Sequence, residues 1–402
     1  MKNAKISLLI LLLSIFYSNA FTQNLVITGN TATFWGDTTI GLTFYVPNAW
    51  DTIVIKENVT VTGNFVTPDE RTKDITVRGE DWNTSVLKGT GNVMPYENNV
   101  LNRRLATAIS NNGKGTLFVE NLKSYNPDKF HLRSEGRIIV NHCNIVQDAG
   151  LGHADGVHGG RRSKSEVHDS YISTWDDATY LSECWLITNT TIVMNGNGAA
   201  FQVGYGNNYV HEDYTCEVIN CTVVGNGDKY SKGVVAWTKN TYNSGPNHAK
   251  IYFENFTLIN NPGKLPLKMY TVGGNNGKTV GSNCEIHVTG DNSICDLNTY
   301  EFRSNSPGIV RVFDCNTEYT RDGISGTHTI TADHSIKIYP NPATDYLNIS
   351  GILPATIIKI YNISGTLALQ STNNERINIS QLENGTYFLK VGSEITKIFM
   401  KE

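Results

Sequence analysis

The chain has 402 residues and a nearly balanced charge, with 33 Lys and Arg residues against 37 Asp and Glu residues. Only 17% of the residues are charged and 39% are hydrophobic, a composition that favours β-structure with many turns over helices. The net charge of −4 provides no basic excess, so we expect neither a nucleic-acid partner nor an anionic membrane surface.

Residues 1–23 have the features of a signal peptide. Two lysines precede an apolar run at Ile6–Tyr17, and Ser18–Ala20 supplies small residues for cleavage. The run is too short for a comfortable membrane span, and no other apolar run approaches that length. We therefore expect the mature protein to be exported and soluble, with no membrane span.

The chain contains seven cysteines, and none of them forms a CxxC pair. The sequence therefore predicts no zinc site, and we expect no metal or cofactor. Cys216 with Cys221, or Cys284 with Cys295, has a spacing that permits a bridge in an oxidising compartment. Buried free thiols in β-strands are the favoured interpretation.

Strand-like alternation begins early in the chain. Apolar and polar residues alternate in Asp51–Phe65 and again in Asp74–Gly91, within a region that extends from about residue 25 to residue 115. We expect this region to form the first coils of the fold described next.

A six-residue pattern recurs through the middle of the chain, with an apolar first position, Asn, Asp or His at the third, and a usually apolar last position. The six copies begin at Val119, Val140, Val167, Ile187, Val218 and Phe253. Their third positions are Asn121, His142, Asp169, Asn189, Asn220 and Asn255, separated by 21, 27, 20, 31 and 35 residues.

A period near 20 residues with insertions predicts one coil per repeat. Alternation buries every second side chain, and Asn tolerates the left-handed conformation needed where one strand bends into the next. The sequence therefore predicts an all-β protein whose residues 24–330 form a right-handed parallel β-helix. We expect the third-position side chains to form an internal ladder with a structural role.

Three aspartates have the spacing of one coil. Asp155 is followed by glycine, and Asp176 and Asp177 lie 21 and 22 residues further on. Residues one coil apart lie above one another on the same face of a β-helix, so we expect the three carboxylates to converge. Like charges this close raise the pKa of at least one carboxyl group, which provides a proton donor at neutral pH.

Glycoside hydrolysis uses such a set of groups. One carboxylic acid protonates the leaving oxygen, and another carboxylate activates water or attacks directly. Two candidate bases beside one acid favour an inverting route, for which carboxyl groups about 6.5–9.5 Å apart are typical.

The segment from Asp155 to Tyr205 resembles the catalytic region of the polygalacturonase and dextranase clan of glycoside hydrolases. Asp155-Gly156 is similar to the first catalytic aspartate of the clan, and Asp176-Asp177 to its catalytic pair. The resemblance implies that Asp176 is the general acid and that Asp155 and Asp177 hold the water.

Further motifs resemble family 49 of that clan, the dextranase and isopullulanase family. These motifs are Val167–Asp169, Ala178 and the Gln-x-Gly-Tyr segment at Gln202–Tyr205. The resemblance implies that Gln202 and Tyr205 contact the sugar. The chain lacks the β-sandwich that precedes the helix in family 49, and the Arg-x-Lys motif of polygalacturonases has no counterpart after Tyr205, which favours a neutral glycan.

Other side chains around the aspartates are candidate substrate contacts. Trp175 can stack on a sugar ring, because the C–H face of the ring suits an aromatic plane. His153, His158 and Arg161 lie in or beside the loop between the aspartate sites and can bind a sulfate or carboxylate group. If they line the cleft, an anionic glycan becomes the alternative substrate, as for a polygalacturonase or carrageenase-type enzyme.

Two other functions stay open. A polysaccharide lyase would use Lys129 or Arg133, which flank His131, as a base. Calcium could then be held by Asp148, Asp155 and Asp176, since Ca²⁺ favours clustered carboxylates. A non-enzymatic glycan-binding adhesin is the third function, although the short, loop-rich helix favours an enzyme.

Residues 335–402 differ from the rest of the chain. Alternation with NG and SG turns predicts a small antiparallel β-sandwich. Tyr339–Pro342, Asn362–Gly365, Asn384–Tyr387 and the Lys-containing end resemble the C-terminal sorting domain of the type IX secretion system. The resemblance implies a secreted or cell-surface location and an interaction with that secretion machinery.

Together these features predict a monomeric, secreted glycoside hydrolase that is inverting and endo-acting on a polysaccharide, with an α-glucan such as dextran as the favoured substrate.

Overall fold

A computed structural model describes most of the chain. The described residues are 23–91, 104–148, 154–159, 164–181, 185–203, 214–228, 233–237, 248–268, 270–272, 283–289, 300–302, 309–313, 317–320, 323–326, 337–350, 357–362, 366–372, 376–391 and 395–402. Residues 1–22 of the predicted signal peptide lie outside them. The chain divides into two compact units, one running to Cys315 together with Tyr319–Ser325, and one of Asn316–Glu318 together with Gly326–Glu402.

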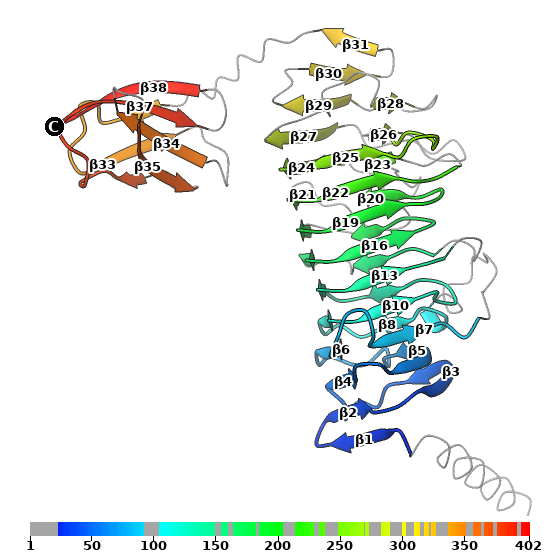
Figure 1. Cartoon of the computed structure of the whole chain (residues 1–402). Helices are drawn as coiled ribbons and strands as arrows, with labels where there is room; N and C mark the ends of the chain where they lie inside the picture. The colour runs from blue at the N-terminus through cyan, green and yellow to red at the C-terminus, as the bar shows by residue number, and fades with distance from the viewer. Residues whose placement is uncertain are drawn as a thin grey trace, which may run out of the picture. The chain divides into compact units, whose positions relative to one another are not determined.

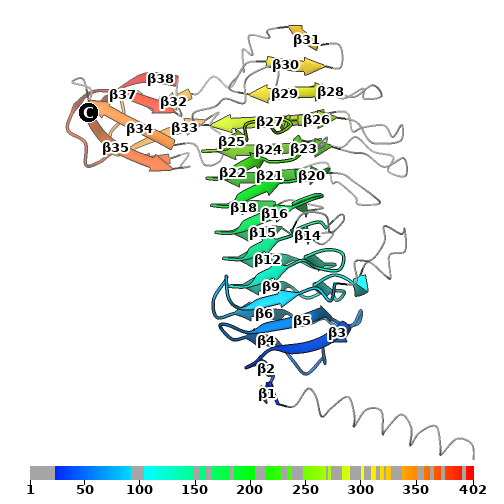
Figure 2. The same ribbon diagram turned by 45° about the vertical axis from the view of Figure 1, so that its right-hand side comes forward.

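The first unit is a parallel β-helix, as predicted, with strands stacked coil upon coil along three faces (Figures 1 and 2). The strands of the first face are β1 (Leu25–Thr28), β2 (Thr31–Phe34), β4 (Thr52–Ile55), β6 (Ile75–Gly79), β9 (Leu117–Glu120), β12 (Ile138–Asn141), β15 (Ser165–His168), β18 (Trp185–Thr188), β21 (Tyr214–Ile219), β24 (His248–Glu254), β27 (Asn283–Thr289), β29 (Ile309–Phe313), β30 (Thr317–Thr320) and β31 (Gly323–Gly326).

The other two faces share one sheet, because the long strands β3 (Thr38–Tyr45) and β5 (Thr60–Val66) begin both of them. The second face continues with β7 (Val86–Lys88), β10 (Lys123–Tyr125), β13 (Asn144–Val146), β16 (Tyr171–Thr174), β19 (Thr191–Met194), β22 (Thr222–Gly225) and β25 (Thr257–Asn260). The third face continues with β8 (Ile109–Asn111), β11 (Leu132–Ser134), β14 (Val157–Gly159), β17 (Thr179–Leu181), β20 (Ala199–Val203), β23 (Gly233–Trp237), β26 (Tyr270–Val272) and β28 (Tyr300–Phe302).

The six-residue repeat coincides with the register of the stack. The first position of every copy pairs with the first position of the next copy, from Val119 through to Phe253. These side chains are at most 1% exposed and line the core of the helix. The last positions pair in the same way, from Ser124 through to Leu258. Sequence alternation therefore fixes which side chains fill the interior.

The third position of every copy is the corner between the first and second faces. All six corner residues have φ between 49° and 55°, the left-handed conformation predicted for them. Their side chains form a ladder along the axis, with Asn255 donating to Asn220 at 2.9 Å and Asn220 to Asn189 at 3.1 Å. The predicted internal position of this ladder is wrong, because its members are exposed or half-buried. The left-handed corner turns them outward while the flanking apolar residues point inward.

The cysteines of the described core are free thiols. Cys143, Cys216 and Cys221 are buried and unbridged, as the favoured interpretation predicted. Burial raises the pKa of the Cys143 thiol to about 12 and that of Cys221 to about 11, so both act as small apolar side chains at neutral pH.

One buried histidine gives the β-helix a pH-dependent stability. His131 is fully buried, with its Nδ1 atom 2.8 Å from Ser124 Oγ. Burial lowers the pKa of His131 from 6.5 to about 3. The folded chain therefore binds fewer protons than the unfolded chain between these values. The stabilising contribution is complete above pH 6.5 and is lost as the pH falls toward 3, at about 1.4 kcal/mol per pH unit.

We expect the His131→Gln variant to lose less stability than wild type when the pH is lowered from 7 to 5. The difference between the two losses should be about 2 kcal/mol, because only wild type has to protonate a buried imidazole. Urea unfolding at both pH values measures it. His142→Asn is the matched control, since His142 is exposed and Asn occupies the equivalent corner elsewhere. Equal losses for wild type and His131→Gln would contradict the assignment.

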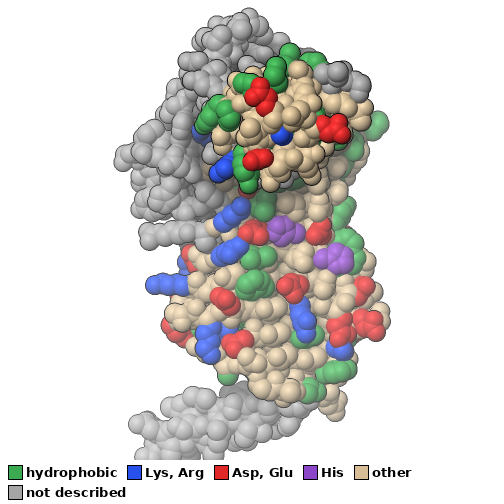
Figure 3. Space-filling view, turned by 90° about the vertical axis from the view of Figure 1, so that its left-hand side faces the viewer, with side chains coloured by type: hydrophobic (Ala, Val, Ile, Leu, Met, Phe, Trp, Pro, Cys, Tyr) green, Lys and Arg blue, Asp and Glu red, His purple; other side chains and the backbone are tan. Residues whose placement is uncertain are grey.

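Charged side chains of both signs are interspersed on the outer surface, as Figure 3 shows for one face. On the first face, Arg137 donates to Glu166 Oε1 at 2.5 Å, and His168 Nε2 lies 2.9 Å from Glu166 Oε2. This mixture agrees with the balanced composition of the chain.

The second unit consists of two small antiparallel sheets, as predicted for the C-terminal segment. One contains β32 (Lys337–Tyr339), β33 (Tyr346–Ser350) and β36 (Arg376–Asn378), and the other contains β34 (Ile357–Asn362), β35 (Leu367–Thr372), β37 (Gly385–Val391) and β38 (Ile395–Lys401). A separate apolar cluster, which includes Leu347, Ile360 and Phe399, forms its core.

Candidate active site

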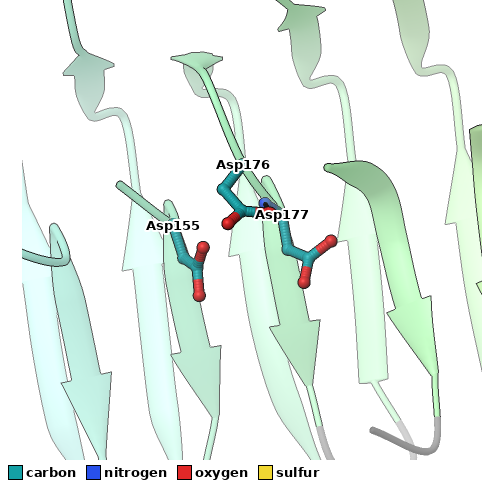
Figure 4. Close-up of side chains that lie close together, drawn as sticks. All are labelled: Asp155, Asp176 and Asp177. Carbon is teal, nitrogen blue, oxygen red and sulfur yellow. Dashed lines mark hydrogen bonds between the residues drawn. The ribbon is translucent and has the colours of Figure 1, made fainter. Parts of the chain in front are cut away.

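The three aspartates lie at the start of the third face, on neighbouring coils (Figure 4). Asp155 directly precedes the β14 coil, while Asp176 and Asp177 lie between β16 and β17. Val157 of β14 pairs with Thr179 of β17, and the Gly156 amide donates to the Asp177 carbonyl at 2.9 Å. This register stacks Asp155 beneath Asp177, one coil apart, so the 22-residue offset of the sequence becomes a contact in space.

The carboxylates converge closely. One oxygen from each of Asp155, Asp176 and Asp177 lies within 4.8 Å of the others. Asp155 and Asp177 are only 7% and 5% exposed, whereas Asp176 is half-buried. The spacing of these nearest oxygens is shorter than the separation of about 6.5–9.5 Å between carboxyl groups that an inverting pair usually has. The cluster therefore consists of two sheltered carboxylates and one that is more open to solvent.

Hydrogen bonds orient each carboxylate. Asp177 Oδ1 accepts from the Ala199 amide of the next coil at 2.9 Å, and Asp176 Oδ1 accepts from the Asp177 amide at 3.1 Å. Asp155 Oδ2 lies 2.6 Å from His158 Nε2. Backbone amides of the stack and one imidazole thus hold the trio in place.

Two glycines allow the coils to approach closely at this point. A Cβ atom on Gly198 would lie 1.9 Å from the carbonyl carbon of Asp176 and 2.2 Å from the amide nitrogen of Asp177. A Cβ atom on Gly156 would lie 2.3 Å from the carbonyl oxygen of Ala178. Only glycine fits at either position, because real Cβ atoms do not come this close to backbone atoms.

The predicted substrate contacts are described only in part. Trp175 is half-buried, and its carbonyl accepts from the Asn197 amide at 2.9 Å. Gln202 is 1% exposed and its Nε2 donates to the Ala236 carbonyl at 3.1 Å, so its side chain is packed within the fold. The predicted sugar contacts of these two residues stay predictions. Tyr205, His153 and Arg161 lie outside the described residues.

The residues considered for a lyase do not gather at the trio. His131 is fully buried inside the helix, and Lys129 is only 4% exposed. Arg133 forms an ion pair with Glu135. The Asp148 carboxylate is exposed and accepts hydrogen bonds from Tyr125 and Asn126, so the close group contains Asp177 and not Asp148.

Sequence reasoning missed the residues that support the trio. Gly196 and Gly198 stand 21 and 22 residues after Trp175 and Asp176, so the one-coil offset that joined the aspartates also pointed to these glycines. Phe130 and Tyr180 pack their rings on the two sides of His158, at centroid distances of 4.7 and 4.8 Å. These contacts have no signal in the sequence, because they depend on side-chain directions.

The fold and its C-terminal unit define the class of protein: an exported parallel β-helix with a detachable type of β-module. Residues 337–401 match the family described as the secretion system C-terminal sorting domain. No curated protein shows significant similarity to the chain.

The sorting domain indicates that the protein is secreted or held at the cell surface, and that its export involves the type IX secretion machinery. Among the described residues, no helix is both long and apolar enough to cross a membrane.

Proposed function

We propose that the chain is a secreted glycoside hydrolase that cuts a polysaccharide with Asp155, Asp176 and Asp177. The observation that supports this most is the convergence of three carboxylates within 4.8 Å on one face of the helix. Mutual repulsion favours one proton shared within such a cluster, and that proton is what a general acid supplies.

The burial of the three groups suggests how they divide the work. Asp176 is the most open of the three and acts as the general acid, because a leaving oxygen of a bulky glycan has to reach it. Asp155 and Asp177 are sheltered and act on water.

The close spacing suits a water held between Asp155 and Asp177. Two hydrogen bonds of about 2.8 Å each can join oxygens up to about 5.6 Å apart through one water. The limit of 4.8 Å between the nearest oxygens falls inside that range. A water held in this way would attack the anomeric carbon directly, which gives inversion of configuration and keeps the third carboxylate as the acid.

A neutral glycan is the proposed substrate, with an α-glucan such as dextran as its best representative. Arg133 is paired with Glu135 and His158 with Asp155, so two of the positive groups nearest the trio are already neutralised. Stacking of a sugar ring on Trp175 is the proposed apolar contact.

The test is release of reducing ends from a panel of polysaccharides that includes dextran, pullulan, polygalacturonate, carrageenan and alginate. We expect the purified protein to cut a neutral α-glucan internally, and NMR of the first product should show an inverted anomeric centre. The Asp155→Asn, Asp176→Asn, Asp177→Asn triple variant serves as the inactive control.

Each other result would assign a different function. Products with the ultraviolet absorbance of unsaturated uronides would replace the hydrolase with a lyase. Retained configuration would replace the water-mediated route with a covalent one. Binding to a glycan without cleavage of any member of the panel would make the protein an adhesin.

A further inference from the structure

His158 is held between two aromatic rings beside Asp155. It is the central residue of β14, and its ring stacks on Phe130 with an interplanar angle of 20° and on Tyr180 with an angle of 35°. The register places Arg133 and Tyr180 on the coils before and after it. The side chain of His158 is 16% exposed, and that of Asp155 is 10% exposed. The imidazole is therefore confined on both faces and largely sheltered from water.

The confined ring directs Nε2 at the carboxylate. Nε2 lies 2.6 Å from Asp155 Oδ2, which is a short distance for an N–H···O hydrogen bond and typical of a charge-assisted one. The ionised carboxylate only accepts hydrogen bonds, so Nε2 carries the proton and donates it. This bond favours the ionised form of Asp155 and fixes the plane of its carboxylate.

We infer that His158 is a positioning residue that keeps Asp155 ionised and oriented to accept a proton from the attacking water. The inference rests on the proposed hydrolase function and departs from a role of His158 as a ligand of an anionic sugar. A sugar ligand would need its Nε2 directed at the substrate, whereas this Nε2 is directed at Asp155.

The central variant is His158→Phe, which keeps a flat ring between Phe130 and Tyr180 but removes the donor. We expect kcat to fall about 10- to 100-fold while KM changes little, since a hydrogen bond to a charged group is lost at the reacting side of the site. The acid limb of the pH–rate profile should move to higher pH, because Asp155 without the donor is harder to ionise. His158→Gln, whose side-chain amide can donate, should recover part of the activity.

The matched control is His168→Phe. His168 also lies beside a carboxylate, with Nε2 2.9 Å from Glu166 Oε2, but on the first face of the helix. We expect its pH–rate profile to equal that of wild type. Thermal unfolding of all variants separates loss of the fold from loss of the hydrogen bond. An unmoved acid limb in folded His158→Phe would overturn the inference.

A second measurement does not depend on turnover. In an NMR titration, the His158 ring signals should change at lower pH in Asp155→Asn than in wild type, because the variant lacks the anion that stabilises imidazolium. Identical titrations would overturn the inference even in an active enzyme. A shifted titration in a protein that cuts no glycan would leave the pair intact and reject the hydrolase function alone.

Discussion

Asp176→Asn is expected to lower kcat on a native polysaccharide by about 10²- to 10⁴-fold, the usual contribution of a general acid. The fold should survive the change. Asp176 is half-buried, and the oxygen of an asparagine side chain can still accept the hydrogen bond that Asp176 Oδ1 receives from the Asp177 amide. The loss would therefore report on proton donation and not on structure.

An aryl glycoside with an acidic phenol separates the acid from the bases. A phenolate leaves without a proton, so Asp176→Asn should lose little activity on that substrate. Asp177→Asn should lose activity on both substrates, because both need an activated water. Asp169→Asn is the control, since Asp169 is an exposed member of the corner ladder and Asn is found at other corners. Equal losses of Asp176→Asn on both substrates would remove Asp176 from the role of acid.

Gly198→Ala is expected to reduce kcat/KM by about 100-fold or more, although residue 198 offers no chemical group. The added Cβ would lie 1.9 Å from the Asp176 carbonyl carbon, so the backbone of the pair has to move. A displacement of about 1 Å at a catalytic group can cost about 10²-fold in rate. Overpacking of this kind also costs about 1–3 kcal/mol of stability.

Gly227→Ala provides the comparison for that variant. It lies at a later turn of the stack, where the nearest heavy atom to an added Cβ, the Asn195 carbonyl oxygen, is 3.2 Å away. We expect it to retain activity close to wild type. Circular dichroism and thermal unfolding establish that both variants are folded, and the ratio of their kcat/KM values is the result. Equal activity of the two variants would show that the Gly198 contact does not position the pair.

Much of the fold could be predicted because a coil repeats its physical demands. The apolar first position of each repeat has to fill the interior, and the third has to adopt a left-handed corner, so both carry a periodic signal from Val119 to Asn255. The same period related Asp155 to Asp177. The direction of the ladder could not be predicted, because period alone does not say whether a corner side chain points inward or outward.

The environment of the trio was less predictable for a related reason. The bond between His158 and Asp155 depends on the rotamer of a side chain confined by Phe130 and Tyr180, which meet only after folding. The burial of Gln202 depends on segments that carry no repeat. Family resemblance suggested roles for such residues but contained no information on their packing.

The fixed register of the corner residues has a consequence for how such a protein can change. Corner positions are separated by as few as 20 and as many as 35 residues, yet each pairs with the next in the same register. Extra residues thus enter between strands without altering the alignment of the coils. The loops around the trio can lengthen, shorten or exchange sequence while Asp155 stays beneath Asp177. Substrate preference and catalytic geometry are in this way encoded by separate parts of the chain and are free to evolve independently.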